Sequence, residues 1–250
     1  MHRFYLPPDQ CRHETLFLAG REAHHARQVL RLRRGDRLTV LDGEGRQFLC
    51  EMRESDRDKV KLAVVQSSAH PPAPCQVTLL QAMPKGKTME TIIQKATELG
   101  VSRIVPLLSE RVVARLGKTD AADRAAKWQS VAVEAIKQCG AAWLPRVEAP
   151  LSPREFLARH EPFEMPLVAS LQPGSRSPKV YLQDFRAERG RNPASGCIWV
   201  GPEGDFTATE IEMIRAGGAL PITLGQLVLR AETAALYCLS ILSYETAAVA

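Results

Sequence analysis

The sequence lacks every cysteine arrangement that would indicate a metal centre or a disulfide framework. Its six cysteines form no CxxC pair, and none stands at zinc-ligand spacing from a histidine; they are residues 11, 50, 75, 139, 197 and 238. We therefore expect free, mostly buried thiols and no metal ligands. Free thiols are typical of a reducing compartment, so we expect a cytoplasmic protein.

Long apolar runs and internal repeats are also missing. The N-terminal stretch MHRFYLPPDQ has no apolar signal core, and no uninterrupted apolar run approaches the roughly 18 residues that span a bilayer. We expect no membrane partner. The hydrophobic content of 45% and the charged content of 24% are ordinary for a globular protein, and 250 residues suffice for one large domain or two smaller ones.

Positive charge exceeds negative charge and is concentrated near the N-terminus. The formal net charge is +5, and the stretch from Arg21 to Arg37 holds six arginines and two acids, with His24 and His25 among them. Arginine suits phosphate because its planar guanidinium binds phosphate oxygens bidentately. A solvated helix face explains the same cluster, so both interpretations stay open at this point.

The hydrophobic pattern changes at a proline-rich segment. Before residue 70, the stretches RLTVLD, QFLCEM and KVKLAVVQ predict short antiparallel strands separated by turns. The segment HPPAP, residues 70–74, has three prolines in five residues, which suits a stiff linker. We therefore predict one domain over residues 1–70 and a second over residues 75–250.

The second domain alternates strand and helix patterns, which predicts an α/β fold with a largely parallel sheet. Expected strands are CQVTLLQAM, VSRIVPLL, MPLVAS, CIWV and PITLG. Expected helices are GKTMETIIQKATELG, residues 123–139, residues 207–216 and residues 230–246. Thr207 and Glu210 have capping-box spacing, which indicates the start of the third of these helices.

A glycine-rich turn follows one of these strands, in the stretch IWVGPEGDFTATEI. It is neither GxGxxG nor GxxxxGK[ST], so the dinucleotide and P-loop signatures are absent, and Glu203 would repel a phosphate. We expect a neutral or cationic ligand, and S-adenosylmethionine fits because it has a sulfonium and no phosphate. The alternative is a plain turn that closes the strand. The stretch LGQLVLRAETAAL repeats the order of strand, glycine and helix start, which favours the ligand site.

Taken together, these stretches resemble the ribosomal RNA small subunit methyltransferase E group of the SPOUT methyltransferases. The resemblance covers nearly the whole chain. Its carriers are HRFYL, HHARQVLRLRRGD, METIIQKATELGVSRIVPLLSER, WQSVAVEAIKQCG, GPEGDFTATE and LGQLVLRAETA. It implies an N-terminal PUA-like β-barrel, a C-terminal α/β domain with a deep trefoil knot, and a homodimer. It also implies that the protein uses S-adenosylmethionine to methylate N3 of a uridine in small-subunit (16S) ribosomal RNA. The substrate is then either the RNA itself or the assembled small ribosomal subunit.

The resemblance also implies roles for particular residues. Those expected to bind the cofactor are Leu171, Val200, Gly201, Pro202, Glu203, Gly204, Leu220, Leu224, Gly225, Leu229, Arg230, Thr233 and Ala234. Those expected to contact RNA are Arg3, His25, Arg27, Arg31, Arg33 and Arg34. The chain departs from the family where Leu227 and Ala141 replace frequent arginines and where Asp205 replaces a second glycine after GPEG.

Uridine N3 becomes a nucleophile when its proton leaves, so the site must stabilise the anion or accept the proton. We hypothesise that Arg230 stabilises the anion, and that Glu203 or Glu232 acts as a base or an organiser, with a structural role favoured for Glu232. Two alternatives stay open. One is a knotted methyltransferase acting on another ribosomal or transfer RNA base, and the other is a non-catalytic RNA-binding factor.

Overall fold

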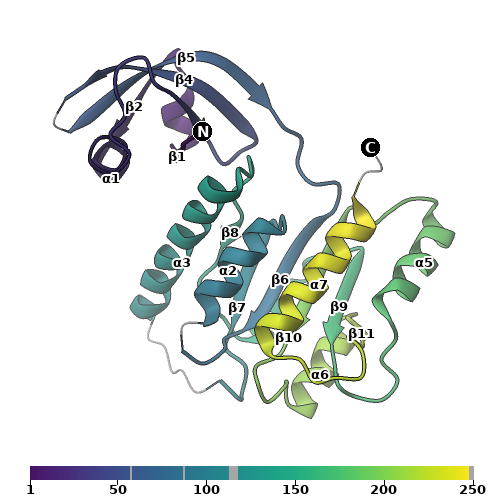
Figure 1. Cartoon of the computed structure of the whole chain (residues 1–250). Helices are drawn as coiled ribbons and strands as arrows, with labels where there is room; N and C mark the ends of the chain where they lie inside the picture. Colours follow the sequence, from purple (N-terminus) through teal and green to yellow (C-terminus); the bar gives the residue numbers. More distant parts are fainter. Residues whose placement is uncertain (57, 87, 113–117, 248–250) are drawn as a thin grey trace. The chain divides into compact units, whose positions relative to one another are not determined.

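The computed structural model describes residues 1–56, 58–86, 88–112 and 118–247 (Figure 1). The chain divides into two compact units. The smaller unit comprises Met1–Pro72 and Val133–Leu144, and the larger comprises Ala73–Ala132 and Pro145–Ala250. Residues 133–144 lie within the predicted domain 75–250, yet they group with the N-terminal residues.

The smaller unit is built on a five-stranded sheet. Its strand order is β1 (Arg3–Tyr5), β3 (Arg37–Leu41), β4 (Arg46–Ser55), β5 (Lys59–Ala69) and β2 (Thr15–Ala19). The neighbours β3, β4 and β5 pair antiparallel, which confirms the predicted strands in this region. The register of β4 against β5 shifts between Leu49 and Cys50 and again between Met52 and Glu54. Such bulges bend a strand and increase its twist, so they curl the sheet around its core.

The core of this unit follows from strand alternation. Leu38 and Val40 of β3 and Leu16 and Leu18 of β2 are fully buried, because every second side chain points to the same face of a sheet. Three short helical segments complete the unit: η1 (Pro8–Cys11), α1 (Gly20–His24) and η2 (His25–Val29). The segment η2 has π-helical bonding, in which the Leu30 amide donates to the His25 carbonyl.

The larger unit contains a six-stranded sheet in which every neighbouring pair is parallel, as predicted for the second domain. The strand order is β11 (Leu220–Ile222), β9 (Met165–Ala169), β10 (Ser195–Val200), β6 (Gln76–Ala82), β7 (Arg103–Leu107) and β8 (Arg146–Val147). Its helices are α2 (Thr88–Glu98), α3 (Lys118–Cys139), α4 (Pro153–Leu157), α5 (Pro178–Arg189), α6 (Ala208–Ala216) and α7 (Ala231–Thr246). From Val133 onward, α3 belongs to the smaller unit.

Helices cover both faces of this sheet, which is why its strands read as continuous apolar runs. On one face, Leu80 and Trp199 pack in a common core with Phe156 of α4 and Ile214 of α6. Figure 1 shows α2 and α7 side by side, and α7 packs against both β6 and β10. The carboxyl ends of all these parallel strands meet at one edge, where ligands of open α/β sheets bind.

Two further expectations can be compared with the structure. All six cysteines are free, and five are buried while Cys139 is exposed, which confirms the predicted free and mostly buried thiols. Within the described ranges, we find no helix that is both long enough and apolar enough to cross a membrane.

Candidate active site

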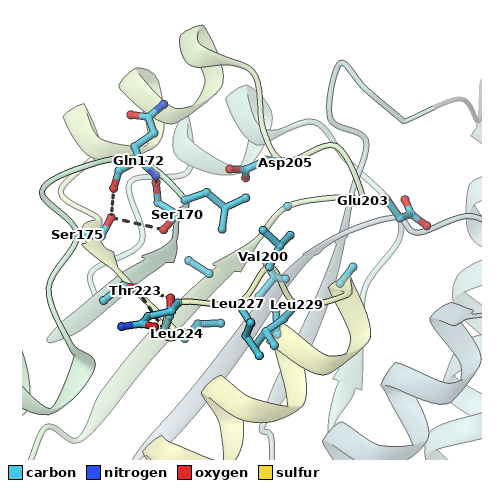
Figure 2. A pocket seen from close by; sticks show the side chains of 18 of the residues that line it. Ser170, Gln172, Ser175, Val200, Glu203, Asp205, Thr223, Leu224, Leu227 and Leu229 are labelled. Carbon is cyan, nitrogen blue, oxygen red and sulfur yellow. Dashed lines mark hydrogen bonds between the residues drawn. The ribbon is translucent and has the colours of Figure 1, made fainter.

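A cavity of about 420 Å³ lies at the carboxyl edge of the large sheet. Three loops form its walls: first residues 201–205 after β10, second residues 223–229 after β11, and third residues 170–175 after β9. Ala231 and Ala234 from the start of α7 complete the lining. Figure 2 shows the labelled side chains of these three loops around the cavity.

The first wall requires a glycine because its turn doubles back on itself. A Cβ atom on Gly201 would lie 2.8 Å from Asp205 Oδ1 and 3.0 Å from the Phe206 nitrogen. Gly201 and Pro202 are buried, whereas Glu203 and Gly204 are exposed. By contrast, a Cβ on Gly204 would make an ordinary contact of 3.5 Å with Arg111 Cδ. A side chain at Gly201 therefore requires the turn to shift.

Asp205 lies at the end of this turn in an unusual backbone conformation. Asp205 has φ of +60°, a left-handed conformation that glycine adopts at little cost and that aspartate tolerates better than most residues. Its Oδ1 accepts a hydrogen bond of 2.8 Å from the Phe206 amide. Asp205 thus holds a conformation that favours glycine, and its own local hydrogen bond supports it.

The helix that follows the turn starts as predicted. Thr207 is the N-cap of α6, its hydroxyl accepts from the Glu210 amide, and Glu210 accepts from the Thr207 amide. Glu210 is almost fully buried and also accepts a bond of 2.9 Å from the Glu110 amide. This carboxylate therefore holds the α6 start against the loop after β7, and it serves structure.

The second wall is the loop after β11. Gly225 has φ of +114°, so the chain turns there in a conformation that L-residues rarely adopt. The Thr223 hydroxyl accepts from the Gly225 amide at 3.3 Å and closes the turn locally. Leu227 and Val228 then lie 77% and 76% exposed. Adjacent apolar side chains left in solvent at a cavity mouth indicate a surface that a ligand or partner covers.

The third wall follows β9 and carries hydroxyl and amide groups. The Gln172 amide donates to Ser170 Oγ at 3.1 Å, and Ser175 Oγ donates to the Gln172 carbonyl at 2.9 Å. Leu171 is 63% exposed on this wall. Leu171 is the one residue of this loop that the sequence analysis predicted. The loop lacks the order of strand, glycine and helix start that marks the other two loops.

Electrostatically, the cavity is acidic. Two carboxylates, Glu203 and Asp205, are among its lining residues, and none of the described lining residues is Lys, Arg or His. Figure 2 shows the Glu203 carboxylate pointing away from Ser170 and Thr223, and its Oε1 accepts a bond of 3.0 Å from the Lys85 amide. The site therefore suits a neutral or cationic ligand and disfavours a phosphate.

The structure brings most of the predicted cofactor residues together. Nine line the cavity: Leu171, Val200, Gly201, Pro202, Glu203, Leu224, Gly225, Leu229 and Ala234. Four lie outside the lining: Gly204, whose carbonyl accepts from Arg111, Leu220 within β11, and the exposed residues Arg230 and Thr233 at the start of α7. Arg230 is the N-cap residue of α7 but makes no side-chain cap bond.

The predicted RNA-binding residues differ in how they are displayed. Arg3 donates to the Gln138 carbonyl at 2.9 Å, so its guanidinium caps the end of α3. His25 is half-buried with its ring 6.0 Å from that of Phe4. Arg27 is also half-buried, whereas Arg31, Arg33 and Arg34 are exposed. The last three therefore present the accessible positive charge.

Comparisons with known proteins agree with this geometry. A family described as RNA methyltransferase domain matches residues 71–243, and one described as RNA methyltransferase PUA domain matches residues 18–65. The chain is 32% identical to ribosomal RNA small subunit methyltransferase E of Bacillus subtilis, covering 93% of this chain and 91% of the relative. It is 32% identical to the Synechocystis protein of the same name, covering 93% of this chain and 74% of that one.

A solved structure is similar over almost the full length. It is the crystal structure of a ribosomal RNA small subunit methyltransferase E from Neisseria gonorrhoeae bound to S-adenosyl methionine. The two chains share 30% sequence identity with a TM-score of 0.85, and the match covers 98% of this chain and 97% of that one. At this level of similarity, fold and domain content are shared.

Proposed function

The chain belongs to the ribosomal RNA small subunit methyltransferase E family of RNA methyltransferases, and we propose that it methylates N3 of a uridine in small-subunit ribosomal RNA. The observation that carries the proposal is the acidic cavity between the loops after β9, β10 and β11. We further propose that S-adenosylmethionine is the ligand of this cavity, since the similar structure from Neisseria gonorrhoeae is bound to S-adenosyl methionine.

The residues present fit this cofactor. Val200, Leu224 and Leu229 offer apolar surface for an adenine, and the turns at Gly201 and Gly225 bring backbone amides and carbonyls to the cavity. The described lining residues include the carboxylates Glu203 and Asp205 and no cation, so the potential of the cavity favours the positively charged sulfonium. When bound, S-adenosylmethionine supplies a methyl group already activated by the sulfonium.

The remaining chemical task is the N3 proton of uridine. We assign Arg230 to stabilising the anion that forms, because a fixed cation near the uracil carbonyls lowers the free energy of that anion. Arg230 is exposed at the N-terminus of α7, where the helix dipole adds to its positive potential. Glu203, which accepts from the Lys85 amide, is assigned to organising the loop after β6.

The proposed partners follow the distribution of charge. Arg31, Arg33 and Arg34 are exposed on the smaller unit, and they suit the phosphates of small-subunit RNA, free or in the assembled subunit. A homodimer, the trefoil knot and the domain bounds 1–70 and 75–250 remain proposals that the family resemblance motivates. The cytoplasm is the proposed compartment, because six free thiols suit a reducing environment.

Nucleoside mapping tests the proposal directly. Small-subunit RNA from a strain lacking this gene should lose 3-methyluridine at one position, and expression of the chain should restore it, as measured by mass spectrometry of digested RNA. Restoration of a different modified base, or of a transfer RNA base, would replace the uridine N3 assignment. Calorimetry with S-adenosylmethionine is the companion measurement, since a chain that binds RNA but not the cofactor is a non-catalytic binder.

A further inference from the structure

A second cavity, of about 610 Å³, lies in the larger unit beside the first. The loop after β6 (Met83–Gly86), the first turn of α2, the loop after β7 and one side of α3 form its walls. Glu203 lines this cavity as well as the acidic one. The two cavities therefore meet at a single side chain on the carboxyl edge of the sheet.

The two cavities have opposite electrostatic character. Four cationic side chains line the second cavity, namely Lys85, Arg111, Arg124 and Lys127, together with the carboxylates Glu90 and Glu203. The acidic cavity has no Lys, Arg or His among its described lining residues. A ligand of the second cavity is therefore expected to be anionic, and it is a different ligand from that of the first.

Two of these cations have internal partners. Lys127 Nζ lies 2.6 Å from Glu90 Oε1, and the Arg111 guanidinium donates to the Gly204 carbonyl, which fixes the turn between the cavities. The side chains of Lys85 and Arg124 are exposed, and neither forms an ion pair or hydrogen bond with the described residues. These two cations are available to an incoming anion.

The floor of the second cavity is apolar. Met83, Met89 and Trp128 line it and are 6%, 3% and 5% exposed. An apolar floor beneath a cationic rim matches a nucleotide, because a base packs on apolar and aromatic side chains while its phosphates contact lysine and arginine. A free phosphate or a small metabolite anion would leave this floor without a function.

We propose that the second cavity is the acceptor site, which receives the target nucleotide after it has left its base stack. Lys85 and Arg124 contact the phosphates that flank it, and Met83, Met89 and Trp128 underlie its base. The inference rests on the proposed methyl transfer, because the two cavities adjoin at Glu203 and a base held in the second cavity lies next to a methyl donor in the first. An enzyme acting on a base must hold it unstacked, so such a pocket beside the donor is expected.

The test uses Lys85→Ala and Arg124→Ala in the full chain, with Lys179→Ala on α5 and Arg154→Ala on α4 as matched controls. The control residues are exposed and line neither cavity. The probe is a fluorescent single-stranded oligouridine, and its affinity is measured from 50 to 500 mM salt in the presence of S-adenosylmethionine. This readout requires no turnover, and comparison of thermal midpoints verifies that all four variants are folded.

Each lost phosphate contact should reduce the slope of log K against log salt by about 0.7 and weaken binding about fivefold at 0.1 M salt. The double variant Lys85→Ala/Arg124→Ala should therefore bind about 25-fold more weakly, while its cofactor affinity and both controls stay at wild-type values. In methyl transfer to small-subunit RNA, the same variants should raise KM for RNA.

Three results separate the outcomes. Unchanged salt slopes in both cavity variants would overturn the acceptor site even if the wild-type chain makes 3-methyluridine. Loss of cofactor binding in these variants would also overturn it, because the cavity would then belong to the donor site. If the slopes fall as expected but the wild-type chain methylates no uridine, the proposed function fails and the second cavity remains an RNA-binding site.

Discussion

Replacing Gly201 with alanine tests whether the turn between β10 and α6 holds its shape through close backbone approach. The added Cβ would lie 2.8 Å from Asp205 Oδ1, 3.0 Å from the Phe206 nitrogen and 3.1 Å from Asp205 Cα. Two of these three atoms are backbone atoms, and the third is held by a 2.8 Å hydrogen bond to Phe206. Relief of the clash therefore requires the turn itself to move.

Overpacking of this kind costs about 1–3 kcal/mol. For a protein of this size, roughly 3 °C of Tm corresponds to 1 kcal/mol, so Gly201→Ala should lower the midpoint by about 3–9 °C. Because the displaced turn forms a wall of the acidic cavity, cofactor affinity should fall as well. If cofactor binding must restore the original shape of the turn at a cost of about 1.4 kcal/mol, the Kd for the cofactor rises about tenfold.

The same motif supplies the control. Gly204→Ala places a Cβ 3.5 Å from Arg111 Cδ, an ordinary contact, so its midpoint and cofactor Kd should stay close to wild type. Differential scanning calorimetry and titration calorimetry measure both quantities on the two variants. If Gly201→Ala and Gly204→Ala have midpoints within about 1 °C of each other, the close-approach explanation of GPEG is wrong.

Four further predictions concern single side chains. Arg230→Ala should lower methyl-transfer turnover at least about 100-fold while calorimetry still detects cofactor binding, and near-normal turnover would refute the role of Arg230. Since Asp205 has φ of +60°, Asp205→Ala should be about 1 kcal/mol less stable than Asp205→Gly, and equal urea midpoints would contradict this. Among the six cysteines Cys139 alone is exposed, and burial raises the pKa of Cys238 to about 12. At pH 8, a thiol reagent should therefore modify one thiol quickly and the other five only when the protein unfolds. A second thiol that reacts quickly would contradict the burial of these five. Glu203→Gln keeps an acceptor oxygen for the Lys85 amide and should retain most turnover, whereas Glu203→Ala should not; equal losses in steady-state assays would indicate a base.

The sheet of the larger unit was predictable because its strands are buried on both faces. Such strands read as apolar runs. Three of the six, β6, β7 and β9, fall within the predicted stretches, and β10 and β11 overlap theirs but begin two residues and one residue earlier. The sixth, β8, has two residues and no pattern of its own, since its pairing with β7 depends on the tertiary fold.

Several helical segments were not predicted because their sequences show no helical period of apolar residues. The helix α4 has five residues, too few to show a period, although Ser152 and Glu155 form a capping box that marks its start. In α5, the buried residues Pro178 and Leu182 give a narrow apolar stripe, so the segment reads as a polar loop. The segment η2 follows α1 without a break, and its π-helical bonding has no sequence period that we could use.

Site prediction succeeded where backbone conformation restricts residue type. Gly201 and Gly225 stand at positions that demand glycine, the first through close approach and the second through φ of +114°, so both motifs are legible in the sequence. Ser170 and Gln172 line the same cavity through side chains that many residue types could replace. The second cavity could not be predicted from the sequence, because its cations Lys85, Arg111 and Arg124 come from segments far apart in the chain and form no local motif.

The role of Glu203, which the sequence left open, depends on the orientation of its side chain. Its carboxylate points away from the acidic cavity and accepts from the Lys85 amide, which belongs to the loop that forms the rim of the second cavity (Figure 2). A carboxylate at this boundary favours a cationic ligand in the acidic cavity and disfavours a phosphate in it. RNA phosphates are therefore expected beside Lys85 and Arg124 in the second cavity. Its charge thus disfavours RNA phosphates in the donor cavity, and its hydrogen bond positions the loop that carries Lys85. The hydrogen bond needs only an acceptor oxygen, which Glu203→Gln keeps, so we assign the main role of Glu203 to organising this loop.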